Sequence, residues 1–269
     1  MCQTLLRRLA TLDQPGHVSL TYVGRVARLT LHNPDRRNAV SGPMIAQLSE
    51  HVDTLSRWDE GAALVLTGAG GHFCAGLDLA LARSEFSTPE SGRMMNEVMG
   101  GLLHRMRQLP LLSVAAIDGY AIGGGAELAT ATDWRVMAPA PGATLRFVHA
   151  KMGVSPGWGG GARLVGLVGR AQALRCLAHG MSLDAGAASA IGLCDAVAEA
   201  GEPAAEAAER LLFAPALAHA ASTEALRAIK TAVAAASEVA AEVRKAEAAA
   251  LVSVWGSGAN QRIVERTKV

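Results

Sequence analysis

Apolar and β-branched residues gather in two short stretches near the start of the chain, Val18–Tyr22 and Val26–Leu31. Such stretches are typical of strands when turn residues bound them. Gly24 lies between the two and suits a tight turn. The pattern therefore predicts a β-hairpin.

An amphipathic helix is predicted after the hairpin. Ser41 can cap its start, and Pro43 in the first turn has a backbone angle that suits a helix. The apolar side chains that follow recur every three or four positions, which is the period of a helix with one buried face. They are Ile45, Leu48, Val52 and Leu55.

Three short apolar runs further along predict buried strands, at Ala63–Thr67, Ser113–Ile117 and Arg135–Ala138. Helix-favouring segments separate them, and strands that alternate with helices indicate an α/β core. From about Glu202 the chain becomes rich in alanine and charge and poor in glycine, so Ala204–Phe213 and Thr223–Val254 are predicted helices. We therefore divide the chain into a core, residues 1–201, and a C-terminal helical region, residues 202–269.

Composition narrows the class of protein. The 269 residues are half hydrophobic and carry a net charge of +1, which suits a folded domain and argues against nucleic-acid binding. No apolar run approaches the roughly 20 residues of a membrane span, and the first 14 residues lack the apolar stretch of a targeting peptide. A cytoplasmic protein is expected, with reduced cysteines at Cys2, Cys74, Cys176 and Cys194.

Two glycine-containing turns carry the candidate chemistry. Asp118–Ala129 places Gly123–Gly125 between an apolar run and a helix-forming segment, and Phe73–Leu79 follows another strand-like run. Glycines let a ligand approach the backbone closely, and the free N–H groups of a helix start then point at that ligand. Two such turns can supply two converging donors, which is the chemistry of an oxyanion hole.

These turns, with three further segments in the same order, resemble the crotonase (enoyl-CoA hydratase/isomerase) superfamily over nearly the whole chain. The further segments are Val26–Ala39, Thr132–Arg135 and Gly153–Leu164. The resemblance implies a spiral of ββα units and a helical region that packs between the subunits of a homotrimer, often doubled to a hexamer. A helical cap on its own subunit is the alternative.

The family likeness also implies an acyl-CoA substrate and assigns residues to it. The N–H groups of Leu77 and Gly124 would hold the thioester oxygen as it becomes an enolate. Coenzyme A is part of this substrate, so no separate cofactor and no metal are expected. The residues expected to bind the substrate are Arg36, Arg37, Ala39, Ala75, Gly76, Asp78 and Trp158. For the two arginines an ordinary solvated charge pair is the alternative, and Asp78 is also expected to cap the following helix.

The sequence departs from the hydratases at their second glutamate. Glu127 matches the first, but the segment Arg146–Gly153 is about two residues shorter and places His149 or Lys151 at the second position. Hydration in this family uses two acids around one water. Ordinary hydratase or isomerase activity is therefore not expected, although both stay as alternatives, as does a catalytically silent paralogue.

Three segments resemble the ethylmalonyl-CoA and methylmalonyl-CoA decarboxylase group in particular, namely Phe147–His149, Gly157–Gly160 and Val254–Gly256. Loss of CO2 from a malonyl-type thioester leaves an enolate that two N–H donors can hold, and no base is needed to start it. The enolate then needs a proton. His149 is the leading donor or carboxylate-orienting group, with Glu127, if burial raises its pKa, or water as alternatives.

Asp133 and Arg135 are expected to form a buried structural pair with each other, with no part in catalysis. Gly153–Gly157 matches the G-x-S-x-G elbow of serine hydrolases. In that elbow the residue after the serine donates its backbone N–H, and Pro156 has none. A serine hydrolase is therefore excluded.

Overall fold

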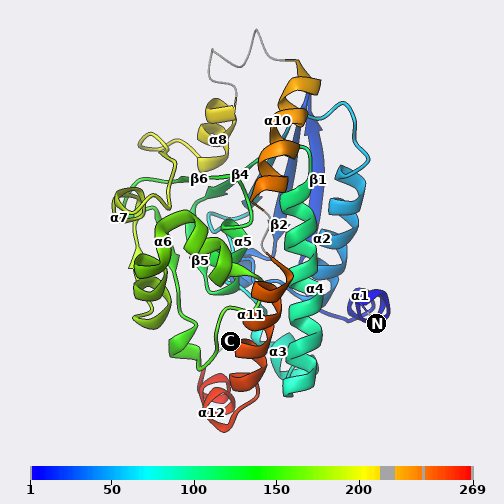
Figure 1. Cartoon of the computed structure of the whole chain (residues 1–269), viewed down its shortest axis with the longest axis vertical. Coiled ribbons are helices and arrows are strands. Elements are labelled where there is room, and N and C mark those ends of the chain that lie inside the picture. Colours follow the sequence, from blue (N-terminus) through cyan, green and yellow to red (C-terminus); the bar gives the residue numbers. More distant parts are fainter. Residues whose placement is uncertain (1, 213–221, 238–239, 268–269) are drawn as a thin grey trace.

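The computed structural model describes residues 2–212, 222–237 and 240–267, and within them strands and helices alternate along the chain (Figure 1). A six-stranded sheet has the order β1-β2-β3-β4-β6-β9, and a three-stranded sheet has the order β5-β7-β8. The strands are β1 (His17–Val23), β2 (Val26–His32), β3 (Ala63–Gly68), β4 (Leu112–Ile117), β5 (Gly119–Ile122), β6 (Trp134–Met137), β7 (Ala143–Arg146), β8 (Ser182–Leu183) and β9 (Ala196–Val197). The predicted hairpin is confirmed, because β1 and β2 pair in antiparallel register.

The helices cover both faces of the larger sheet. They are α1 (Cys2–Ala10), α2 (Gly42–Leu55), α3 (Leu79–Glu85), α4 (Pro89–Gln108), α5 (Gly124–Ala129), α6 (Gly160–Ala178), α7 (Ala185–Ala190), α8 (Ala204–Leu212), α10 (Thr223–Ala236), α11 (Ala241–Val254) and α12 (Gly258–Arg266), with short 3-10 turns at Pro34–Arg36 and Ala150–Met152. Alternate residues of β3 point to opposite faces: Leu64 and Leu66 join a core with α2 and α4, while Val65 joins a second core with α8. Burial on both faces explains why the strand predicted at Ala63–Thr67 is a continuous apolar run.

The predicted helices are present with changed limits. Ser41 occupies the capping position of α2, but its hydroxyl makes no capping hydrogen bond. The helix predicted at Ala204–Phe213 is seen to Leu212, and Phe213 lies outside the described residues. The helix-favouring stretch Thr223–Val254 contains two helices, α10 and α11. Helix propensity is favourable throughout that stretch, so composition alone could not locate the break.

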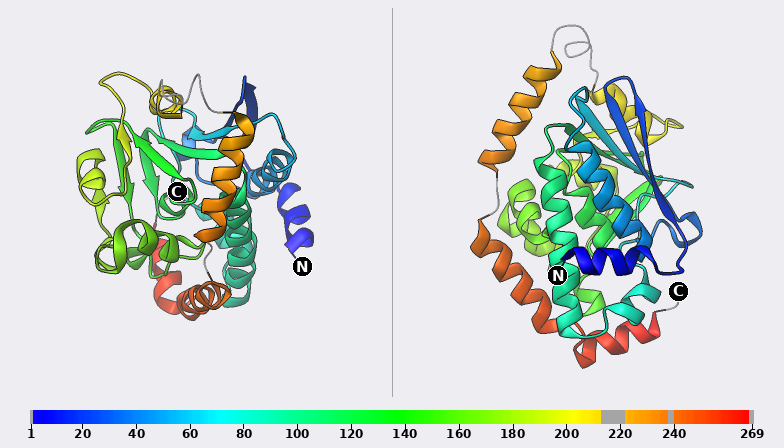
Figure 2. Two further views of the ribbon diagram at one scale, coloured as in Figure 1. Left: turned by 45° about the horizontal axis from the view of Figure 1, so that its top comes forward. Right: turned by 90° about the vertical axis from the view of Figure 1, so that its right-hand side faces the viewer.

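Helices α10, α11 and α12 run along one side and the lower end of the same chain (Figure 2). Only Leu251 of α11 and Asn260 of α12 are buried. The hydrogen bonds that join these two helices to the core include Asn260 Nδ2 to the Met152 carbonyl (2.9 Å), Trp255 Nε1 to the Phe86 carbonyl (2.7 Å) and the Gly161 N–H to Glu247 (3.3 Å). In this chain, α11 and α12 therefore cover their own subunit, while the homotrimer and the division at residue 201 stay predictions.

Asp133 and Arg135 do not pair with each other through their side chains, contrary to the expectation. Arg135 binds the Asp195 carboxylate at 2.5 Å, and Asp133 binds Lys230 of α10. Asp195 also accepts the backbone N–H of Arg135, so a single carboxylate satisfies two donors of that residue. Each residue thus ties its strand to a different later segment, 60 or more positions away.

Candidate active site

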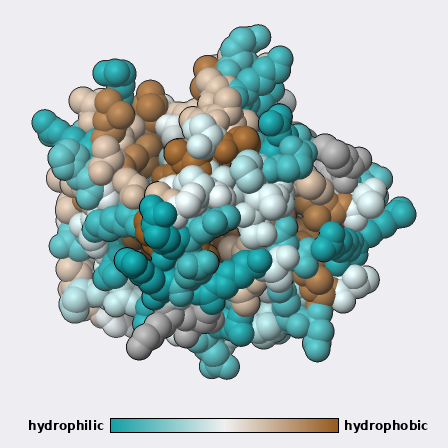
Figure 3. Space-filling model, turned by 90° about the horizontal axis from the view of Figure 1, so that it is seen from below, coloured by the Kyte–Doolittle hydropathy of each residue, from teal (hydrophilic) through white to brown (hydrophobic). Residues whose placement is uncertain are grey.

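A cavity of about 560 Å³ opens at the lower end of the molecule, between the two glycine turns and the C-terminal helices. Figure 3 views this end, where hydrophilic residues dominate the surface and apolar residues show between them. Separate parts of the chain line the cavity, namely Ala75–Leu77 with α3, Met95 of α4, the segments 122–127 and 148–158, and α11 with α12. The site is therefore assembled by tertiary folding rather than by one local motif.

The two glycine turns pack directly on each other. Cys74 forms a bridge with Ala121, and the Ile122 N–H donates to the Cys74 carbonyl at 2.9 Å. A Cβ atom on Gly125 would lie 2.0 Å from that carbonyl oxygen. A Cβ atom on Gly76, whose φ is +92°, would lie 3.1 Å from the Gly124 nitrogen. Glycine at these positions is what allows the turns to approach.

The amides of Leu77 and Gly124 both border the cavity, and neither has a hydrogen-bond acceptor within the described part of the chain. The backbone N–H groups on either side of Leu77 already have acceptors. The Gly76 N–H donates to Cys74 Sγ, and the Asp78 N–H donates to the Val40 carbonyl at 3.0 Å. Gly124 is the first residue of α5, where N–H groups lack partners within the helix. The arrangement leaves two backbone donors for a ligand.

Glu127 is buried, and both of its carboxylate oxygens are fully used. Oε1 accepts from His149 Nε2 at 3.0 Å and from the Gly157 N–H at 3.2 Å. Oε2 accepts from the N–H groups of Trp158 at 2.8 Å and Gly160 at 2.9 Å. One carboxylate thus organises the turn at residues 157–160 and anchors the imidazole of His149.

These contacts determine the charge of Glu127. Burial by itself would raise the pKa of the carboxyl group, but the hydrogen bond and charge of His149, the charge of Arg163 and the Trp158 N–H together lower the pKa below its usual value of 4.5. The suggestion that burial raises the pKa of Glu127 enough to make it the proton donor is therefore wrong. Hydrogen bonds to the ionised form outweigh desolvation here.

Since the folded state lowers the pKa of Glu127, its contribution to stability is complete above about pH 4.5 and is lost as the pH falls below that value. We expect the free energy of unfolding in urea to fall between pH 5 and pH 3, and to fall less in Glu127→Gln, which does not titrate. Equal losses in the two proteins would contradict this assignment of charge.

The ambiguity between His149 and Lys151 is resolved by the 3-10 turn that follows His149. His149 is 5% exposed, borders the cavity and contacts Glu127, whereas Lys151 is exposed on the other side of the turn. The ionised Glu127 is only an acceptor, so His149 Nε2 carries hydrogen in their bond. His149 Nδ1 is buried and has no hydrogen-bond partner in the described part of the chain.

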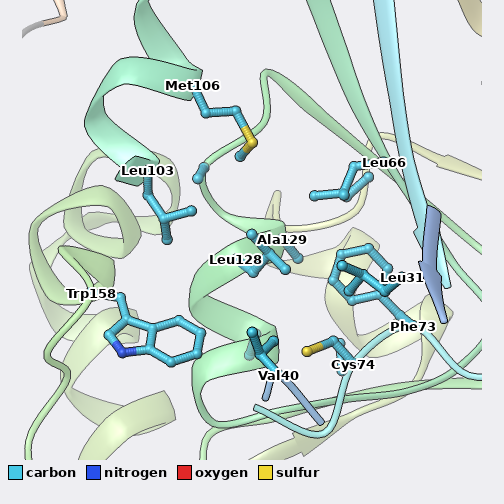
Figure 4. Packing of buried hydrophobic residues seen from close by; sticks show 14 of the residues in the cluster. Leu31, Val40, Leu66, Phe73, Cys74, Leu103, Met106, Leu128, Ala129 and Trp158 are labelled. Atoms are coloured by element: carbon cyan, nitrogen blue, oxygen red, sulfur yellow. The ribbon is translucent and has the colours of Figure 1, made fainter. Parts of the chain in front are cut away.

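Trp158 forms a wall beside the free amide of Gly124. A Cβ atom on Gly124 would lie 2.6 Å from the indole Cη2 atom, so the ring rests against this glycine. The indole Nε1 donates to Met95 Sδ at 2.8 Å. Figure 4 shows the indole in the apolar cluster with Leu103 of α4 and Leu128 of α5. The prediction that Trp158 walls the pocket agrees with this position.

The other predicted substrate-binding residues divide into two groups. Ala75 and Gly76 line the cavity. Arg36, Arg37, Ala39 and Asp78 are outside its lining. Asp78 caps α3 through the N–H groups of Ala80 and Leu81, as predicted, and also binds Arg36 at 2.7 Å. Arg36 is therefore held by a carboxylate rather than solvated as in the alternative, whereas the alternative stays open for Arg37.

Arg37 is exposed and belongs to a half-buried cluster around Tyr120. Its guanidinium is 5.3 Å from the centre of the Tyr120 ring, and that of Arg146 is 4.5 Å from the same centre. His72 stacks on this ring, and burial followed by the charge of Arg37 lowers the pKa of His72. Neither arginine has a carboxylate partner among the described residues, so the cluster presents positive charge.

Sequence reasoning missed the residues that close the cavity opposite the glycine turns. They are Arg83, Phe86, Met95, Leu251, Trp255, Asn260 and Val264. Trp255 and Phe86 are hydrogen-bonded although 169 positions separate them, and no local pattern indicates such a contact. The resemblance noted at Val254–Gly256 was the one available signal.

No helix in the three described ranges is long and apolar enough to cross a membrane. The same residues contain no group of three or more His, Cys, Asp or Glu side chains that could hold a metal ion.

Comparisons with known proteins agree with this geometry. The family model described as enoyl-CoA hydratase/isomerase matches residues 22–261. A Mus musculus protein named ethylmalonyl-CoA decarboxylase is 40% identical over 245 residues, covering 88% of this chain and 73% of the mouse protein. A Danio rerio protein of the same name is 41% identical over 239 residues, covering 87% and 78%. The crystal structure of an enoyl-CoA hydratase/isomerase from Mycobacterium paratuberculosis has a TM-score of 0.82 at 22% identity, covering 95% of this chain and 100% of that one, which shows a common fold.

Proposed function

The chain belongs to the enoyl-CoA hydratase/isomerase (crotonase) family, and from this premise we propose that it decarboxylates a branched malonyl thioester, ethylmalonyl-CoA or methylmalonyl-CoA. Membership confirms the resemblance and the crotonase-like spiral expected from the sequence. The relatives from mouse and zebrafish carry the name ethylmalonyl-CoA decarboxylase, which supports this substrate class.

The observation that carries the proposal is the saturation of Glu127. Hydration needs two carboxyl groups that hold a water and exchange protons with it, but both oxygens of Glu127 are already occupied by four hydrogen bonds from the protein. Its partner at the second position is the imidazole of His149 rather than a second acid. The pocket therefore retains the means to hold an enolate but lacks the means to activate water.

The free amides of Leu77 and Gly124 are proposed as the oxyanion hole. The bond between C2 and the carboxylate carbon breaks, CO2 leaves, and the electron pair moves through C2 and C1 onto the thioester oxygen. Two backbone donors already in place stabilise the charge that develops there. Because the lining is mainly apolar, the carboxylate loses its hydration on binding, and this favours its release as neutral CO2.

His149, with a proton on each ring nitrogen, is proposed to orient the substrate carboxylate through Nδ1–H and then to give that proton to C2 of the enolate. Its Nε2–H is held by Glu127, so Nδ1 is the atom available to the cavity. After transfer the neutral ring regains a proton from solvent, which completes the balance of one proton consumed for each CO2 released.

Coenzyme A phosphates are proposed to meet Arg37 and Arg146, since both lie over the half-buried Tyr120 ring and lack carboxylate partners among the described residues. Arg36 serves this site indirectly by holding Asp78. We also propose that the protein works without a cofactor, assembles through its helical region as a homotrimer or a hexamer, and acts in the cytoplasm.

A panel of CoA thioesters read by mass spectrometry tests the proposed reaction. We expect ethylmalonyl-CoA to give butyryl-CoA and methylmalonyl-CoA to give propionyl-CoA, with crotonyl-CoA unchanged. Conversion of crotonyl-CoA to a product 18 mass units heavier, with no loss of CO2 from the malonyl esters, would replace decarboxylation with hydration. Binding of all three esters without turnover would indicate a silent paralogue.

A further inference from the structure

Met95 and Trp158 form one rigid unit at the inner end of the cavity, which we call the indole–thioether wall. Met95 belongs to α4 and is 2% exposed, and Trp158 is 3% exposed. The indole N–H donates to the thioether sulfur, while the backbone N–H of Trp158 is held by Glu127. Neither side chain can rotate away without leaving a buried donor unpaired.

The wall adjoins the position of C2 in the proposed substrate. Gly124 donates one of the two amides proposed to hold the thioester oxygen, and the indole rests against the Cα atom of this same glycine. C2 is one bond from the carbonyl carbon. A substituent on C2 that points inward therefore meets the wall first.

The second neighbour of C2 has the opposite chemistry. Glu127 binds both the Trp158 N–H and His149 Nε2, so the indole and the imidazole flank one carboxylate. Among the described buried polar side-chain atoms without a partner, His149 Nδ1 is the one on the cavity lining. A carboxylate accepts a hydrogen bond from this nitrogen when Nδ1 carries the proton of the proposed mechanism, whereas an alkyl group is stabilised by contact with the apolar wall.

On the basis of the proposed function, we infer that the indole–thioether wall receives the alkyl branch of the substrate and that Met95 sets the largest branch accepted. The carboxylate on C2 then faces His149, so the two substituents of C2 are sorted by chemistry. Met95 is a specificity-determining residue in this assignment.

Shortening Met95 tests the inference, since Met95→Ala removes Cγ, Sδ and Cε and makes room for a longer branch. The measurement is the ratio of kcat/KM for 2-butylmalonyl-CoA to that for 2-ethylmalonyl-CoA. A pocket discriminates about 10- to 200-fold for each methylene, so we expect this ratio to rise at least tenfold. Met94→Ala, which shortens a half-buried methionine on the same helix but outside the cavity lining, is the matched control and should leave the ratio unchanged. An unchanged ratio in Met95→Ala would overturn the inference.

A second measurement keeps this test separate from the proposed reaction. Hexanoyl-CoA and butyryl-CoA are the products expected from 2-butylmalonyl-CoA and 2-ethylmalonyl-CoA. Isothermal titration calorimetry with these two products measures how the wall affects binding, without any turnover. In Met95→Ala the Kd of hexanoyl-CoA should fall relative to that of butyryl-CoA. In the bulkier Met95→Phe it should rise relative to that of butyryl-CoA. If neither variant changes the relative Kd values, Met95 does not determine specificity, even if decarboxylation is observed. If both variants change them but no CO2 is released, only the proposed decarboxylation is rejected.

Discussion

Replacing Gly124 with proline is expected to lower kcat for decarboxylation by at least about 10²–10³-fold, the usual effect of losing one oxyanion donor. Proline has no N–H, and its ring carbon would occupy the place where the thioester oxygen binds. The change falls on the first residue of α5, where proline is tolerated, so the fold should survive. Steady-state CO2 release with ethylmalonyl-CoA, together with circular dichroism, measures both expectations.

Gly124→Ala is the control for this substitution. Any Cβ atom at this position meets the Trp158 ring at 2.6 Å, so both variants displace the indole, but alanine keeps the N–H. We expect Gly124→Ala to retain clearly more activity than Gly124→Pro. If the proline variant is as active as the alanine variant, the Gly124 amide does not hold the developing charge.

Replacing His149 with alanine is the second large expected effect, a fall in kcat of about 10²–10⁴-fold, the range for a lost proton-transfer group. The variant removes the nitrogen proposed to face the substrate carboxylate and the enolate. The product in D2O is the sharper measurement. Wild-type enzyme should deliver deuterium to one face of C2, giving one stereoisomer of 2-deuterated butyryl-CoA, while residual turnover by the variant should give both.

Lys151→Ala supplies the comparison for His149→Ala, because Lys151 is the other residue that the sequence placed at this position and it is exposed. Its activity should match the wild type. Thermal unfolding of His149→Ala should be recorded as well, since the change leaves Glu127 with one hydrogen-bond donor fewer. An unchanged rate and a single stereoisomer in His149→Ala would assign the proton to a bound water.

The parts of the site that were predictable are those whose signal is local. The turns at Phe73–Leu79 and Gly123–Gly125 could be recognised because close approach of two backbones requires glycine at particular positions. The cap at Asp78 follows from the same kind of reasoning, since a carboxylate before a helix meets its first N–H groups. Strand and helix types followed from periodicity.

The partners of charged residues were not predictable in the same way. Arg36 was expected to meet phosphates, yet it is held by Asp78, 42 positions later. Asp133 was paired with Arg135 on proximity, yet it binds Lys230 of α10, 97 positions later. Such pairings depend on how distant elements dock, and neither propensity nor spacing carries that information.

The protonation of Glu127 shows a third limit. Its burial could be anticipated from its place in a glycine-rich helix start, and burial alone raises the pKa of a carboxyl group. The outcome is reversed by N–H groups of residues 157–160 and by His149, which reach it only in the folded chain. The surroundings of the Glu127 carboxyl group, rather than its residue type, therefore determine the direction of its pKa shift.

Closure of the cavity by α11 and α12 has a consequence for how this protein loses activity. These helices contribute one buried residue each, Leu251 and Asn260, whereas the sheet is enclosed in two apolar cores. Segments with so little buried surface detach at a lower free energy than the rest of a structure. Under mild heating or denaturant, we therefore expect an isolated subunit to lose activity while the spectroscopic signature of the native sheet persists, whereas burial of these helices in the proposed homotrimer would bring inactivation and global melting closer together.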